Sequence, residues 1–224
     1  DIQLYPDIVQ KIITVKMALN NNKTSIKRLI LSAQSFNTPV HQKIKTLSIS
    51  MPRITNDTIV LQYPMGGHPL LWSEFHPALY KLHITIDWKN GTTQEKDVPF
   101  GMRSFTVRGK HFDINGHPTF LRGTVENCVF PLTGYPSMKE ADWERIFRIS
   151  KSYGLNHMRF HSYCPPEEAF DAVDRGGIVR HPVGPSWANH GTSLGDGKPV
   201  DQYIFDETDR MEKYYGNHTS YCML

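Results

Sequence analysis

Apolar and polar residues alternate with a period of two through the first hundred residues of the chain. One run places Ile13, Val15 and Met17 on one face, and residues 80–88 alternate in the same way before an Asn-Gly turn. Short alternating runs between turn residues are typical of antiparallel strands with one face against a core and the other in water. This part of the chain is therefore expected to form an antiparallel β-sandwich.

After about residue 104 the pattern changes. Asn115-Gly116 lies between two alternating runs and predicts a hairpin. Ser137 and Glu140 have the spacing of a capping box that opens a helix ending at Gly154, and residues 156–161 read as the next strand. Further helices and strands are expected at residues 165–177, 178–179, 201–215 and 220–224. Strands that alternate with helices predict βαβ units and a parallel sheet, either a barrel or a doubly wound fold.

Composition narrows the classes of function. The chain has 224 residues, 39% of them hydrophobic, a net charge of +3 and three cysteines. The small charge and the absence of a long apolar run give no indication of nucleic acid or membrane as partners. Three widely spaced cysteines do not make a disulfide framework. Four histidines, at 157, 161, 181 and 190, raise the alternative of a metal site. They are not spaced as in a compact metal-binding motif, so no metal is predicted.

Several stretches carry a family resemblance. They are Leu71–Tyr80, which has the pattern W-x-x-x-x-P-x-L-Y, the F-G-x-R junction at 100–103, Leu121-Arg122-Gly123, the segment 159–165, and the N-H-x-S stretch that starts at Asn217. Together they resemble glycoside hydrolase family 2, the β-galactosidase, β-glucuronidase and β-mannosidase group. The resemblance implies an immunoglobulin-like β-sandwich at residues 1–103, followed by the first half of a (β/α)8 TIM barrel at residues 104–224.

The resemblance also implies an activity. The full-length enzyme would hydrolyse a terminal β-linked sugar with retention, through a glycosyl-enzyme intermediate and without a cofactor. In the family the fourth barrel strand runs into Gly-Asn-Glu, which carries the acid/base. Both catalytic glutamates are thus expected beyond Leu224, so this chain is expected to be an inactive fragment. A non-catalytic carbohydrate-binding or scaffolding remnant is the alternative. The resemblance slightly favours a periplasmic or secreted protein, and oligomeric state is left unknown.

One predicted strand carries candidate site residues. Alternation puts Met158 and Phe160 on one face of residues 156–161, and Arg159 on the other face with His157 and His161. Polar residues near the end of a barrel strand lie where barrel enzymes bind substrate. The resemblance implies that Arg159 shapes the pocket around the nucleophile, with His161 beside it in a transposed order. A buried arginine with a purely structural role is the alternative for Arg159.

Two loops complete the candidate substrate site. Glu126 and Asn127 follow the first expected barrel strand and could form hydrogen bonds with sugar hydroxyls. Trp187, Asn189 and His190 lie in a long loop rich in glycine and proline, and a tryptophan beside polar groups is a usual sugar-binding combination. A solvated turn and a tryptophan that caps the core are the alternatives for these two loops. His181-Pro182 stands where much of the family has Asp-Glu.

Overall fold

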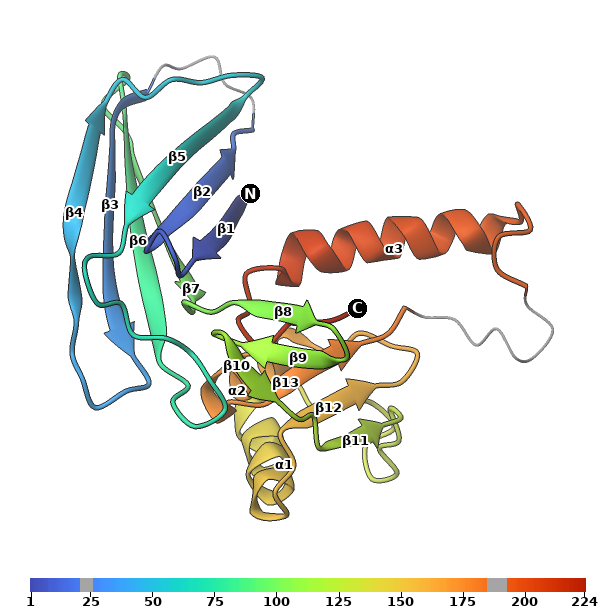
Figure 1. Ribbon diagram of the computed structural model, residues 1–224. Helices are drawn as coiled ribbons and strands as arrows, with labels where there is room; N and C mark the ends of the chain where they lie inside the picture. Colours follow the sequence, from blue (N-terminus) through green and yellow to red (C-terminus); the bar gives the residue numbers. More distant parts are fainter. Residues whose placement is uncertain (21–25, 185–192) are drawn as a thin grey trace. The chain divides into compact units, whose positions relative to one another are not determined.

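The computed structural model describes residues 1–20, 26–184 and 193–224 of the chain (Figure 1). The chain divides into two compact units, Asp1–Pro118 and Thr119–Leu224. Every regular element described in the first unit is a strand, whereas the second unit alternates strands with helices. Among the described residues, no helix is both long enough and apolar enough to cross a membrane.

Two antiparallel sheets make up most of the first unit. One has the order β1-β2-β5 and the other β4-β3-β6-β7. The strands of the smaller sheet are β1 (Ile2–Asp7), β2 (Ile12–Ala18) and β5 (Thr58–Pro64). Those of the larger sheet are β3 (Ile26–Phe36), β4 (Lys43–Ser50), β6 (Leu79–Trp88) and β7 (Thr93–Phe100).

A single buried cluster joins these two sheets. Ile13, Val15 and Met17 of β2 belong to it, as do Leu82 and Ile84 of β6. These are the residues that the alternating pattern assigns to one face. The predicted division into a core face and a wet face is therefore confirmed for both strands, because the apolar side chains of each sheet exclude water by packing against the other sheet.

The hairpin predicted at Asn115-Gly116 is also confirmed. Strand β8 (Phe105–Arg108) pairs with β9 (His111–Ile114), and β9 with β10 (His117–Thr119). Asn115 and Gly116 connect β9 to β10 with φ angles of 54° and 78°. Two consecutive positive φ angles are what a tight hairpin turn needs, and Asn-Gly adopts them at low cost.

The second unit contains a parallel sheet in the order β11-β12-β13. Its elements are β11 (Gly123–Glu126), α1 (Glu140–Ser152), β12 (His157–Phe160), α2 (Glu167–Gly176), β13 (Val179–Pro182) and α3 (Pro199–Tyr215). After α3, Tyr221 forms a parallel bridge with Arg180. The strand expected over residues 220–224 is thus reduced to one bridge, since β13 is the only strand beside it in the described part of the chain.

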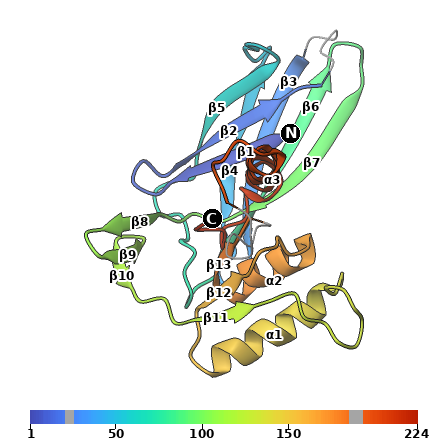
Figure 2. The same ribbon diagram turned by 90° about the vertical axis from the view of Figure 1, so that its right-hand side faces the viewer.

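Helices α1 and α2 pack on the same face of this sheet (Figure 2). Their shared core contains Trp143 and Phe147 from α1, and Met158 and Phe160 from β12. Trp143 stacks on Phe147 and meets Phe160 edge to face. The large aromatic surfaces removed from water here hold the two helices against β12.

The capping box predicted for α1 is wrong. The helix begins at Glu140 with Lys139 as its N-cap, and no side chain caps it. The Ser137 hydroxyl instead accepts from the Lys139 backbone N–H at 3.2 Å and donates to the Asp142 carboxylate at 2.5 Å. Ser137 therefore lies two residues before the N-cap position that the box requires, and its hydrogen bonds order the turn before the helix.

Candidate functional site

Strand register sets the two faces of the parallel sheet. Met158 and Phe160 point toward the helices, so Arg159 lies on the opposite, open face, as the alternating pattern predicts. Arg159 pairs in register with His181 of β13, and His157 with Val179. Partners in register share a face, so His157, Arg159 and His181 all belong to the open face.

Two imidazoles meet on this face. The ring centroids of His157 and His181 are 6.0 Å apart. Burial, and to a lesser degree His181, lowers the pKa of His157 to about 4. Burial and then the nearby Arg159 guanidinium lower the pKa of His181. Both rings are therefore neutral at pH 7 and can each donate and accept a hydrogen bond, while Arg159 carries the positive charge.

Gly123 makes room for one of these rings. A Cβ atom at this position of β11 would collide with the His157 imidazole. His157 Nε2 is buried and has no hydrogen-bond partner among the described residues. Buried polar atoms in proteins are normally hydrogen-bonded, so this nitrogen is an exception in the described part of the chain.

Glu126 has different surroundings from those of the open face. It pairs in register with Phe160, so its side chain lies on the helix-facing side of the sheet. Its Oε1 accepts from the Cys128 backbone N–H at 2.9 Å, and its Oε2 accepts from the Tyr163 hydroxyl. Burial raises its pKa, against the opposing effect of backbone hydrogen bonds. The carboxylate thus orders the β11 loop, and its predicted contact with sugar stays a prediction.

The structure describes only two of the remaining predicted site residues, His161 and Asn127. His161 follows the end of β12, where its N–H donates to the Glu126 carbonyl at 2.8 Å and its Nδ1 is 2.7 Å from the Ser162 hydroxyl. Asn127 is exposed. Trp187, Asn189 and His190 lie outside the described residues. The structure brings Arg159 together with two histidines, and the roles predicted for all these residues remain predictions.

Sequence reasoning missed a buried polar cluster on the helix-facing side. Asp174, in the last turn of α2, accepts from His218 Nδ1 and from the Ser220 backbone N–H, both at 2.8 Å. Burial by itself would raise the pKa of Asp174, but attraction to His218 and these hydrogen bonds lower it. The Arg180 N–H in turn donates to the Ser220 carbonyl at 2.8 Å. This cluster fixes where the chain leaves α3 and meets β13.

Arg180 is the unexpected member of that cluster. Its side chain is fully buried, and none of its three guanidinium nitrogens forms a hydrogen bond within the described residues. The guanidinium lies over the Phe170 ring and within 5.5 Å of the centre of the Tyr221 ring. Burial lowers its pKa to about 9 despite the nearby Asp174 carboxylate. Aromatic faces therefore replace the water that this cation has lost.

A metal centre finds no support in the described part of the chain, where no group of three or more His, Cys, Asp or Glu side chains could hold an ion. The open face instead combines hydrogen-bonding rings with one guanidinium. That combination suits a neutral polyhydroxylated ligand or one with a partial negative charge.

Comparisons with known proteins agree with the resemblance found in the sequence. The family model for glycosyl hydrolases family 2 matches residues 1–103. A β-galactosidase of Vibrio vulnificus is 28% identical over 55% of the chain and 12% of its own length. A putative β-glucuronidase of Formosa agariphila is 25% identical over 72% of the chain and 18% of its own length. Mouse β-glucuronidase is 30% identical over 53% of the chain and 18% of its own length.

Solved structures extend the likeness of fold to the whole chain. The crystal structure of Parabacteroides merdae β-glucuronidase superimposes with a TM-score of 0.76 at 21% identity, covering 100% of this chain and 27% of that one. The chain spans less than a fifth of the length of each of the three curated relatives in the preceding paragraph. Its resemblance to family 2 glycoside hydrolases is confirmed.

Proposed function

We propose that this chain, as part of a family 2 glycoside hydrolase, supplies one wall of the substrate site of a retaining β-glycosidase. In this proposal residues 1–103 are its immunoglobulin-like β-sandwich, and residues 104–224 are the first half of its TIM barrel. Two antiparallel sheets with a common core support the first assignment. Three parallel strands with intervening helices and the Arg180–Tyr221 bridge support the second.

The open face of β12 and β13 is the observation that carries the proposal. Arg159 and His181 lie there toward the carboxyl ends of β12 and β13, where barrel enzymes place their sites, and His157 lies on the same face at the amino end of β12. Two neutral imidazoles can exchange hydrogen bonds with sugar hydroxyls, and the guanidinium can hold a carboxylate in its ionised form. The relatives' names point to a terminal β-linked sugar as the substrate.

The two catalytic carboxylates are proposed to come from elsewhere in the enzyme. A retaining glycosidase needs two carboxyl groups about 5–5.5 Å apart. Glu126 is bound to Tyr163 on the helix-facing side, and Asp174 is held by His218 and Ser220. Neither is placed as one of such a pair on the open face. Chain 1–224 by itself should therefore bind substrate weakly and leave it intact.

Saturation-transfer NMR with methyl β-galactoside and methyl β-glucuronide tests this function. We expect a signal for at least one of them that is lost in Arg159→Met and kept in Arg28→Met, whose arginine pairs with Asp87 on the first unit. No release of nitrophenol from the matching aryl glycosides is expected. Absence of saccharide binding would contradict the substrate-site assignment. Turnover abolished by mutating a carboxylate within the chain would contradict the assignment of catalysis to other parts of the enzyme.

A further inference from the structure

The first unit carries a groove on the outer face of its larger sheet. Residues from all four strands, β4, β3, β6 and β7, line a hollow of about 700 Å³. The buried cluster of this unit lies on the other side of the sheet, so the groove faces solvent. It belongs to a different unit from the open face of β12 and β13.

A β-bulge in β4 shapes this groove. The register between β3 and β4 shifts between Leu31↔Leu47 and Ala33↔Ile44, so that Ser32 opposes two residues instead of one. Those two residues, Lys45 and Thr46, are both exposed. A bulge re-aims side chains and bends its strand locally, which is why consecutive residues of β4 border the hollow.

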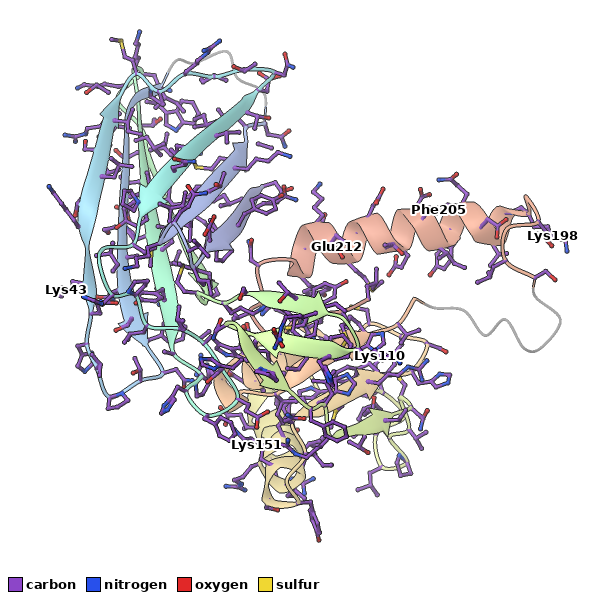
Figure 3. The ribbon with its side chains drawn as sticks, viewed as in Figure 1. Lys43, Lys110, Lys151, Lys198, Phe205 and Glu212 are labelled. Atoms are coloured by element: carbon purple, nitrogen blue, oxygen red, sulfur yellow. The ribbon has the colours of Figure 1, made fainter. Side chains whose placement is uncertain are left out.

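The groove has an excess of positive charge. Lys43, Lys45 and Lys81 line it, against the single carboxylate of Asp97. Asp97 is already occupied, with His83 Nδ1 at 2.7 Å and Lys81 Nζ at 3.6 Å. Within the described residues, neither Lys43 nor Lys45 has an ion-pair partner, and Lys43 projects away from β4 (Figure 3). Two ammonium groups on one strand are thus available to an anion.

We propose that this groove binds an acidic saccharide, one that bears carboxylate or sulfate groups, as a second and non-catalytic site. Lys43 and Lys45 would pair with the anionic groups, and the Gln34 amide and Thr46 hydroxyl line the same hollow and can bond sugar hydroxyls. The choice of a saccharide rests on the proposed function, whereas the choice of an anion rests on the groove alone.

Calorimetric titration of the full chain at low salt tests the proposal with four probes. They are an oligogalacturonate, a sulfated galactan oligosaccharide, a neutral galacto-oligosaccharide of equal length, and a short DNA duplex. We expect binding of at least one acidic saccharide, which identifies the anionic group, and at least tenfold weaker binding of the neutral one and of DNA. Affinity should fall as salt is raised, because exposed charges are screened.

Variants connect the binding to the groove. Lys43→Ala combined with Lys45→Ala should weaken acidic-saccharide binding at least tenfold, and the corresponding arginine pair should preserve it. Lys16→Ala, an exposed lysine on the other sheet, is the control and should change nothing. Equal binding of the neutral saccharide or of DNA would overturn the proposal, as would an equal loss in Lys16→Ala. Loss of acidic-saccharide binding in Arg159→Met would move it to the open face, whereas failure of the methyl glycosides to bind would count against the proposed function alone.

Discussion

The two faces of the β11–β12–β13 sheet each carry one arginine, and the two arginines are in opposite situations. Arg159 lies on the open face beside His181 and His157. Arg180, on the neighbouring strand, lies among helix side chains, with no solvent exposure and its guanidinium over Phe170. Residue type is the same in both cases, so backbone alternation, and not polarity, decides which face a side chain joins.

The difference has an energetic consequence. A buried cation without hydrogen bonds loses hydration that the aromatic rings and the Asp174 carboxylate only partly replace. Arg159, half-buried on the open face, keeps access to water and to ligands. The helix-facing side should therefore be sensitive to the loss of the Asp174 carboxylate, whereas Arg159 on the open face can be replaced with little loss of stability.

The largest expected effect is the loss of the Asp174 carboxylate. Asp174→Ala removes the acceptor of both His218 Nδ1 and the Ser220 N–H, and leaves Arg180 without its nearby anion. Breaking a buried ionic network by deleting one partner costs about 3–5 kcal/mol in the free energy of unfolding. Hydrogen exchange of the α2 and β13 amides measures this, since it reports opening of the second unit.

Asp171→Ala is the matched control, one turn earlier on the same helix. Its carboxylate lies 4.0 Å from His218 Nδ1 and is 39% exposed. A partly exposed pair at this distance contributes about 1 kcal/mol or less. If both variants lowered protection equally, the buried hydrogen bonds of Asp174 would not be what holds the turn at 218–220.

Sequence reasoning succeeded where one rule acts locally. The alternation around Met158 and Phe160 placed Arg159 correctly, and Asn115-Gly116 identified a hairpin because only a few residue types favour two positive φ angles. The same alternation extended by one residue from Val179 would have placed Arg180 on the helix-facing side. The strand expected at residues 178–179 stops one residue short of Arg180, so the pattern assigns this arginine to neither face.

Contacts between distant segments could not be predicted in this way. Asp174 and His218 are 44 residues apart, and nothing in either local pattern indicates that the two side chains meet. The hydrogen bond between Glu126 and the Tyr163 hydroxyl likewise joins residues 37 positions apart, and no local pattern indicates it. The capping motif at Ser137 failed for a different, local reason, because the helix begins at Glu140 and the Ser137 hydroxyl bonds Lys139 and Asp142 instead.

Replacing Arg180 tests whether the buried cation stabilises the helix-facing side of the sheet. Arg180→Met keeps an unbranched side chain between Phe170 and Tyr221 but removes a charge that has no hydrogen bond in the described structure. Apolar replacement of buried ionic groups is often neutral or stabilises by about 1–4 kcal/mol. Thermal melting should thus show an equal or higher midpoint. Arg175→Met, which removes an exposed partner of Glu140, should leave the midpoint nearly unchanged. A large loss of stability in Arg180→Met would show that the cation–π contacts stabilise the fold.

A smaller loss is expected from crowding the open face. Gly123→Ala places a Cβ atom against the His157 ring, which must then move. Forcing an extra carbon into an occupied position typically costs about 1–3 kcal/mol. Gly67→Ala is the control, because its Cβ would meet no atom within 4 Å. We expect chemical-shift changes at His157 and His181 only in the first variant, and unchanged His157 resonances there would contradict the packing described.

The smallest effect is a pH dependence that originates from His157. The imidazole ordinarily titrates near pH 6.5, and burial, with a lesser contribution from His181, lowers its pKa to about 4 in the folded chain. Between these values the unfolded chain binds a proton that the folded chain does not, so the folded state loses stability as the pH falls from 6.5 toward 4. Solvent around the half-buried ring keeps the change below the roughly 1.4 kcal/mol per pKa unit of a fully buried group.

His157→Asn should reduce this dependence, and His111→Asn, at an exposed position, should not. NMR titration of the ring measures the pKa directly, and a value near 6.5 would show that water reaches the open face freely.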